Sequence, residues 1–324
     1  MTAIPQVTSA VSHDSLEIPL IDFSTFSSPT ASAETKLTTA KAILSGFQNA
    51  GFIYLRNHGI PKDVVQHTFA QSAEFFARPQ SQKDALAWTT PEANRGYVAQ
   101  GREKVTDFTD AKEIEELRAA EGEDIKESLE IGREGEKDHP NHWPEVDGEK
   151  FKASMLDFFE KCKDLHVQVM RAIAVGLGID EKWFDKYCDV GDNTLRLLHY
   201  PEVKATVFKE NERKDMAGGL QVLSPNGNFV NATPIEDTIV VNAADLLARW
   251  SNDTIKSTKH RVVEPPAPAA SGVHPARYSI AYFCNPNFES YIDAIPNTVD
   301  EAKGKKYPGI NSGEYLVQRL TATY

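Results

Sequence analysis

Two stretches of this chain, Ser257-Thr258-Lys259-His260-Arg261-Val262-Val263 and Arg277-Tyr278-Ser279-Ile280-Ala281-Tyr282-Phe283, lie on either side of a short loop. Both are rich in β-branched or aromatic residues, so each is predicted to form a strand. In the second stretch, Arg277 and Ser279 are two residues apart and therefore face the same side of a sheet. The sequence thus predicts an imidazole and an arginine fork within one barrel.

His260 and Arg277 carry the chemistry that these strands could provide. A neutral imidazole is the commonest side-chain metal ligand. A guanidinium donates two parallel charge-assisted hydrogen bonds to one carboxylate, and the neighbouring Ser279 hydroxyl suits the same grip on a small dicarboxylate. Simpler interpretations are a hydrogen-bonded core histidine for His260 alone and, for Arg277, a buried ion pair such as one with Asp245.

The bulk properties limit the class of protein. A length of 324 residues is compatible with one large domain. The net charge of -12, from 35 basic and 47 acidic residues, disfavours nucleic acid or an anionic membrane as partner, so we expect a small-molecule substrate. The three cysteines form neither a disulfide framework nor a zinc pattern. Without an apolar span or a signal-peptide pattern, the protein is expected to be soluble and cytoplasmic; its oligomeric state is not predicted.

Helices are predicted where apolar residues recur every three or four positions. The segments are Leu37 to Phe47, a helix from Pro61 to Phe76, a long helix from about Phe151 to Leu177 that Gly178 ends, and a closing helix from Gly313 to Leu320. Residues 101–150 are highly charged and contain prolines and glycines, so they are assigned to loops and short pieces. Residues 1–16 lack periodicity and are expected to form a loose tail.

Strands are predicted in the second half of the chain, where short β-rich runs alternate with turn residues. The runs are Leu195 to Tyr200, Gly219 to Leu223, Asn228 to Ala232, Thr238 to Val241, Ser257 to Val263 and Arg277 to Asn285, preceded by Gly51 to Leu55 near the amino end. Regularly spaced short strands of this kind are typical of a sandwich or barrel. The predicted fold class is therefore α+β with a mainly β core.

At several places the sequence resembles the isopenicillin N synthase-like branch of the Fe(II)/2-oxoglutarate-dependent dioxygenases, in particular its fungal members. The resemblance runs from about Ile18 to the carboxyl end. It is carried, in order, by Ile18-Pro19-Leu20-Ile21-Asp22, Asn57-His58-Gly59-Ile60-Pro61, Asn94-Arg95-Gly96-Tyr97, Leu195-Arg196-Leu197-Leu198-His199-Tyr200-Pro201, Gly218-Gly219-Leu220-Gln221-Val222, Val241-Asn242-Ala243-Ala244-Asp245-Leu246-Leu247 and Ser257-Thr258-Lys259-His260-Arg261-Val262.

The resemblance implies a double-stranded β-helix, or jelly roll, braced by the long helix. It implies a single oxygenase-like domain over residues 17–324, made of an N-terminal region (17–150), the long helix (151–178), the jelly-roll core (194–285) and a C-terminal segment (286–324). It further implies oxidative decarboxylation of 2-oxoglutarate coupled, through a ferryl intermediate, to oxidation of a small organic substrate. Secondary metabolism and the breakdown of a small heterocycle are both compatible with it.

The resemblance also implies roles for particular residues. His260 would be the distal Fe(II) ligand, Arg277 and Ser279 would bind the remote carboxylate of 2-oxoglutarate, and Tyr200 would help to hold it. His199 alternates with Tyr200 on a strand, so only one of them can face the barrel interior, and the match favours Tyr200. Phe283 would form part of the wall.

The chain departs from the family at one place. Family members have a His-x-Asp pair and an apolar strand between Tyr-Pro and Gly-Gly-Leu-Gln-Val, whereas here Tyr200-Pro201 leads through a charged stretch directly to Gly218. None of the 9 histidines has Asp or Glu two positions later. Two of the three iron ligands and one core strand are therefore expected to be missing, which makes Fe(II) binding and activity doubtful.

Three interpretations of this gap remain. The chain is a splice or gene-model variant of an active oxygenase, which the ordinary family sequence on both sides favours, or a degenerate relative that has lost activity. It could instead be a binding protein that uses the Arg277 and Ser279 pocket for a carboxylate. Rescue of the iron site by a carboxylate from the charged stretch, Glu210, Glu212 or Asp215, is disfavoured because no second imidazole accompanies it.

Overall fold

The computed structural model describes residues 7–102, 126–204, 219–263, 272–300, 302 and 304–323. The strands are β1 (Val7–His13), β2 (Leu16–Asp22), β3 (Phe52–Arg56), β4 (Gly96–Val98), β5 (Glu127–Gly132), β6 (Thr194–Tyr200), β7 (Val203–Lys204), β8 (Leu220–Leu223), β9 (Phe229–Asn231), β10 (Thr238–Asn242), β11 (His260–Val262), β12 (Val273–His274), β13 (Arg277–Phe283), β14 (Tyr291–Ile292) and β15 (Ile310–Asn311). The helices are α1 (Ser24–Ser27), α2 (Ala33–Asn49), α3 (Lys62–Phe76), α4 (Gln80–Asp84), α6 (Gly148–Gly176), α7 (Asp185–Cys188), α9 (Asp245–Trp250) and α10 (Ser312–Thr323).

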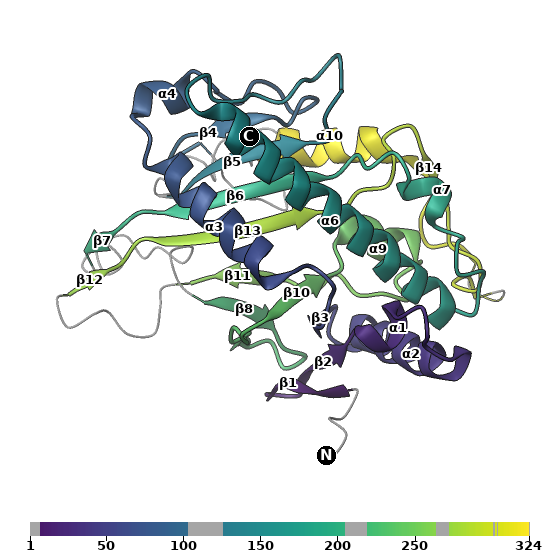
Figure 1. The fold of residues 1–324 in the computed structure, drawn as a ribbon. Coiled ribbons are helices and arrows are strands. Elements are labelled where there is room, and N and C mark those ends of the chain that lie inside the picture. The colour runs from purple at the N-terminus through teal and green to yellow at the C-terminus, as the bar shows by residue number, and fades with distance from the viewer. Residues whose placement is uncertain are drawn as a thin grey trace.

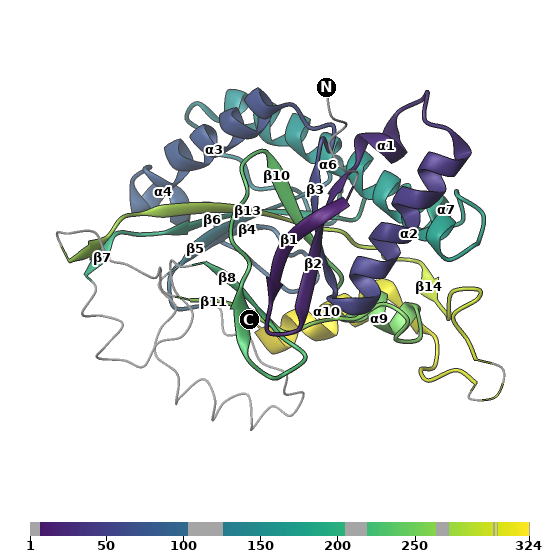
Figure 2. The same ribbon diagram turned by 90° about the horizontal axis from the view of Figure 1, so that it is seen from below.

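One sheet, in the order β13-β6-β5-β4, holds most of the predicted site. Alternate residues of β6, such as Leu195 and Leu197, point to one face and pack against aromatic residues of α3 and α6. We call this side the helix face and the opposite side the inner face. Figure 2 shows the layers, with α3 and α6 above the sheet and β8 and β11 beyond its inner face.

A second sheet, in the order β1-β2-β3-β10, lies beside the first. Its residues Ile53 and Leu55 pack against α2 and against the carboxyl half of α6, around Ile173. The amino half of α6, around Met155, packs on the first sheet. This 29-residue helix therefore spans both sheets (Figure 1), as its apolar period predicted. It ends at Gly176, and Gly178, predicted to stop the helix, follows two residues later with a φ of +72°.

The remaining strands form smaller sheets, in the orders β11-β8-β9, β12-β7 and β14-β15. Val222 and Val230 from the first of these pack against Phe52 and Tyr54 of β3, and this contact closes the core between two β layers. The α+β fold with a mainly β core agrees with the prediction. Among the described helices, none is long and apolar enough to cross a lipid bilayer.

Two predictions about local structure were wrong. Residues 7–16 are not part of a loose tail, because β1 pairs with β2 from Val7 to His13, and Asp14 in the turn accepts hydrogen bonds from Ser224 and Asn228. Residues 127–132, within the region assigned to loops and short pieces, form the fully buried strand β5 in the middle of the first sheet. Its two glutamates are buried because each has a cationic partner, and composition alone does not reveal such partners.

Two of the described sheets each end in a strand that lies on the side of the predicted gap, and the loss of a core strand there stays a prediction. Within the described part of the chain, β13 ends the first sheet and β10 ends the second, and both sheets lie under α6. Residues 277–282 of β13 are only half-buried, and Val240 of β10 is 38% exposed. Open edges of this kind are normally covered or paired.

A buried histidine on α6 should make stability depend on pH. Burial lowers the pKa of His166 to about 4, whereas an unfolded histidine has a pKa near 6.5. As the pH falls, the unfolded state therefore binds the proton first. The free energy of unfolding should decrease by about 3 kcal/mol in total between pH 6.5 and pH 4. His166→Leu should remove this loss, measured as urea-unfolding free energy at pH 7 and pH 5. The exposed His67→Leu serves as control, and parallel pH profiles for wild type and His166→Leu would contradict the assignment.

Candidate functional site

Arg277, Ser279 and Tyr200 share the inner face of the first sheet. In the antiparallel ladder of β13 and β6, Arg277 lies directly opposite Tyr200, and Ser279 lies opposite Leu198. Residues paired in this way project to the same face, so the predicted alternation of Arg277 and Ser279 is confirmed. The Arg277 guanidinium lies 4.5 Å from the centre of the Tyr200 ring. The structure therefore brings together the three residues predicted to bind the co-substrate.

The surroundings of Arg277 suit an anionic ligand. Its Nε is buried, and within the described part of the chain this atom has no hydrogen-bond partner. The predicted alternative of an ion pair with Asp245 is wrong, because the Asp245 carboxylate lies 3.2 Å from Arg319 Nε and accepts a hydrogen bond from the Tyr315 hydroxyl. A guanidinium that contacts an aromatic ring in this way can still donate its hydrogen bonds to a carboxylate.

A second cation on the inner face was not predicted from the sequence. Arg196 of β6 lies opposite Glu130 of β5, with 2.6 Å between Nε and Oε1. The Arg196 guanidinium is also 5.0 Å from the centre of the Phe283 ring, which is 47% exposed. The alternation of Glu127-Ser128-Leu129-Glu130-Ile131 could have indicated this strand. The inner face thus combines a half-exposed aromatic ring with a charged pair.

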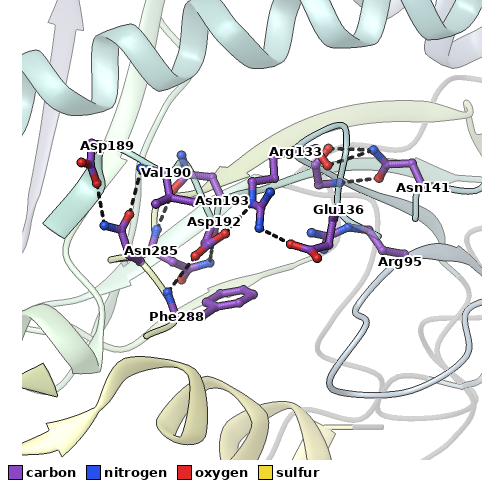
Figure 3. A network of polar contacts seen from close by, with 12 residues as sticks. Arg95, Arg133, Glu136, Asn141, Asp189, Val190, Asp192, Asn193, Asn285 and Phe288 are labelled. Carbon is purple, nitrogen blue, oxygen red and sulfur yellow. Dashed lines mark hydrogen bonds and ion pairs between the residues drawn. The ribbon is translucent and has the colours of Figure 1, made fainter. Parts of the chain in front are cut away.

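A polar network fixes the end of the sheet near this ring (Figure 3). The Asp192 carboxylate accepts hydrogen bonds from Arg133 Nε at 2.7 Å and from the Phe288 backbone N–H at 2.8 Å. Asn193 Oδ1 accepts the Asn285 backbone N–H at 2.9 Å. Arg95, only 3% exposed, donates to the carbonyls of Ala93 and Asn94. These bonds hold loops that are far apart in sequence around one end of the inner face.

His260 lies in a different layer from Arg277. It is on β11, opposite Val222 of β8, and its ring contacts the edge of Phe52 with 5.4 Å between ring centres. Its Nδ1 is 3.2 Å from the Thr258 carbonyl oxygen. Because a carbonyl only accepts, Nδ1 is the donor, and the lone pair of Nε2 remains available. This is the tautomer that a histidine needs to bind a metal through Nε2.

The described residues do not make a ferrous site. In residues 7–102, 126–204, 219–263, 272–300, 302 and 304–323, no three His, Cys, Asp or Glu side chains are placed so that they could hold a metal ion. A non-haem Fe(II) site of this kind needs two histidines and a carboxylate, and only His260 is a candidate. The carboxylates of Glu210, Glu212 and Asp215 lie outside the described residues.

Comparison with known proteins supports the predicted family. A family model described as the N-terminal part of a non-haem dioxygenase in morphine synthesis matches residues 18–146, and the model of the 2OG-Fe(II) oxygenase superfamily matches residues 198–286. The 2-oxoglutarate-Fe(II) type oxidoreductase ppzD of Metarhizium rileyi is 32% identical over 305 residues, which cover 88% of this chain and 85% of that protein. The 2-oxoglutarate-dependent dioxygenase frbA of a Dothideomycetidae species is 30% identical, over 95% of this chain and 98% of that protein.

Solved structures give the same result for the fold. A full-length Neurospora crassa protein, crystallised in complex with alpha-KG and thymine, is 59% identical with a TM-score of 0.87, over 98% of this chain and 100% of that one. A 2OG-Fe(II) oxygenase family protein of Caulobacter crescentus is 26% identical with a TM-score of 0.76, over 97% and 99%. The predicted jelly roll is thereby confirmed. The chain belongs to the 2OG-Fe(II) oxygenase superfamily, whose members are dioxygenases that use Fe(II) and 2-oxoglutarate.

Proposed function

We propose that this chain binds 2-oxoglutarate on the inner face of its first sheet. It would hold Fe(II) too weakly to convert 2-oxoglutarate to succinate. Arg277 would grip the remote carboxylate through its donor fork, with Ser279 adding a hydroxyl and Tyr200 supporting the guanidinium. The observation that carries this proposal is that the buried Arg277 Nε has no hydrogen-bond partner among the described residues, while the guanidinium carbon lies 4.5 Å from the centre of the Tyr200 ring. Burying such a donor costs free energy that a bound carboxylate would recover.

Iron does not fit the residues that the structure describes. His260 would contribute one ligand through Nε2, and the described residues include no group of three His, Cys, Asp or Glu side chains that could hold the ion. A single imidazole binds Fe(II) far more weakly than two histidines and a carboxylate together. The described residues therefore do not support an oxidative step on this chain. Its proposed activity is binding, with 2-oxoglutarate turnover at or near background.

The organic ligand that we propose is a small flat heterocycle of the thymine type. Support comes from the thymine bound in the Neurospora crassa protein, which is 59% identical to this chain. The half-exposed Phe283 ring offers a stacking surface, and the charged pair of Arg196 and Glu130 lies beside it on the inner face. An aromatic surface next to both a donor and an acceptor suits a ring that carries carbonyl and N–H groups.

The test uses the purified full-length chain. We expect isothermal titration calorimetry to show saturable 2-oxoglutarate binding with EDTA present, because the proposed grip does not need metal. Elemental analysis after incubation with Fe(II) should give much less than one iron per chain, and succinate release should stay at background with or without thymine. Failure to bind 2-oxoglutarate would refute the binding proposal. Stoichiometric iron with succinate release would refute the loss of turnover.

A further inference from the structure

A buried ionic cluster lies on the helix face of the first sheet, directly behind the residues proposed to bind 2-oxoglutarate. At its centre is Glu127 of β5, whose Oε1 is 2.7 Å from His199 Nδ1 and whose Oε2 is 2.7 Å from Lys83 Nζ. Oε2 also accepts a hydrogen bond from the Tyr97 hydroxyl. We call Lys83, Tyr97, Glu127 and His199 the back cluster. Its members come from α4, β4, β5 and β6.

The back cluster is charged although it is almost completely buried. The side chains of Lys83, Glu127 and His199 are 8%, 4% and 14% exposed. Burial alone would raise the pKa of Glu127, but hydrogen bonds from His199, Lys83 and Tyr97 outweigh it and hold the pKa below its usual range. An ion pair in apolar surroundings adds little stability compared with apolar residues of similar size. Stability alone therefore does not account for this arrangement.

Aromatic stacking connects the back cluster to the inner face. The His199 ring is nearly parallel to the Tyr278 ring, at an angle of 14° with 4.8 Å between centres. His199 and Tyr278 are opposite each other in the ladder of β6 and β13, and the next pair is Tyr200 and Arg277. One pair stacks on the helix face, and its neighbour forms the cation–π contact on the inner face. Contacts that limit the motion of His199 and Tyr278 therefore also limit the motion of the adjacent Tyr200 and Arg277.

This connection matters because β13 is the edge of its sheet within the described chain. Among the described strands, only β6 pairs with it, so side-chain contacts must limit the motion of its amino end, where Arg277 lies. A binding group must be held within about 0.5 Å of its productive position by surrounding contacts. We propose that the back cluster, through His199, is a positioning device that sets Arg277 and Tyr200 for the 2-oxoglutarate carboxylate, an inference that rests on the proposed function.

The central variant is His199→Phe, which keeps a ring against Tyr278 but removes the hydrogen bond to Glu127. We expect it to weaken 2-oxoglutarate binding about tenfold by calorimetry, the size of effect typical of residues that orient a ligand-binding group. Phe159→Leu is the matched control. Phe159 contacts Tyr282 at the other end of β13, also from the helix face, with 5.2 Å between ring centres. It should lower the melting temperature without changing the 2-oxoglutarate Kd.

A double-mutant cycle separates positioning from general loosening of the fold. If His199 acts through Arg277, then His199→Phe should have little further effect once Arg277→Lys has removed the fork. Additive effects, an unchanged Kd in His199→Phe, or an equal loss in Phe159→Leu would each overturn the inference while leaving the proposed function intact. Absence of 2-oxoglutarate binding in the wild-type chain would overturn both, and this is measured first.

Discussion

Insertion of a His-x-Asp segment from a family member, with the apolar strand that follows it, between Lys214 and Asp215 is expected to raise succinate release from 2-oxoglutarate by at least about 10³-fold. The insert would add an imidazole and a carboxylate beside His260. The backbone hydrogen bond of His260 is made by Nδ1, so Nε2 can bind the metal. These three groups make up the ligand set of a non-haem Fe(II) site. Iron content should rise to about one per chain in parallel with succinate release.

The same insertion should stabilise the fold for a separate reason. The described parts of β13 and β10 are edge strands of two sheets under one helix, and an added strand would satisfy backbone groups of both edges. The control is an insert of identical length in which alanine replaces its histidine and aspartate. It should raise the melting temperature as much as the full insert but bind no iron. Succinate release from the control, or an equal rate from the parent chain, would contradict the assigned cause of inactivity.

The four longest described helices could be predicted because their signals are local, whereas the short helices α1, α4, α7 and α9 were not predicted. The apolar residues of α6 recur along a continuous segment, and Gly178 follows its end. The same holds for α2, α3 and α10, whose cores lie within the predicted ranges. The strands β6, β8, β9, β10, β11 and β13 were also found, because β-rich runs between turn residues need no distant partner to be recognised. The two-residue strands β7 and β12 were not predicted.

The complete burial of the central strand β5 could not be predicted, although its alternation could have indicated a strand, because this burial depends on residues far away in the sequence. Glu127 is buried only because Lys83 and His199 bond to it, and Glu130 only because Arg196 lies opposite. A charged segment with prolines nearby normally indicates a loop. The amino-terminal hairpin was missed for a related reason, since β1 depends on pairing with β2 and on the bonds from Asp14 to the β8–β9 turn.

The candidate site was predictable in its residues but not in its geometry. Alternation along one strand predicted that Arg277 and Ser279 share a face, and the resemblance added Tyr200 and His260. The contact of Arg277 with Tyr200 depends on the register of β13 against β6, and a shift by one residue would have placed His199 there instead. Register is a property of the assembled sheet, so neither this contact nor the stack behind it could be read from spacing.

Loss of the arginine fork is expected to abolish most of the 2-oxoglutarate affinity of the wild-type chain. Arg277→Ala removes two charge-assisted hydrogen bonds and should weaken binding about 100-fold, or about 3 kcal/mol. Arg277→Lys keeps the charge and loses the planar fork, so it should weaken binding about tenfold. Ser279→Ala removes one neutral hydrogen bond and should cost about fivefold. Calorimetry with EDTA present measures all three without interference from metal.

The order of these losses tests the geometry more sharply than any one of them. Arg261→Ala is the matched control, because the Arg261 guanidinium also covers a ring, 3.9 Å from the centre of Phe229, but it lies on β11 and its Nε donates to Gln221 Oε1 at 2.9 Å. It should leave the Kd unchanged. If Arg277→Lys bound 2-oxoglutarate as tightly as the wild type, a single positive charge would suffice. The planar guanidinium above Tyr200 would then not be the group that binds the carboxylate. If Arg261→Ala and Arg277→Ala lost affinity equally, the site would have to lie between the two sheets, closer to His260.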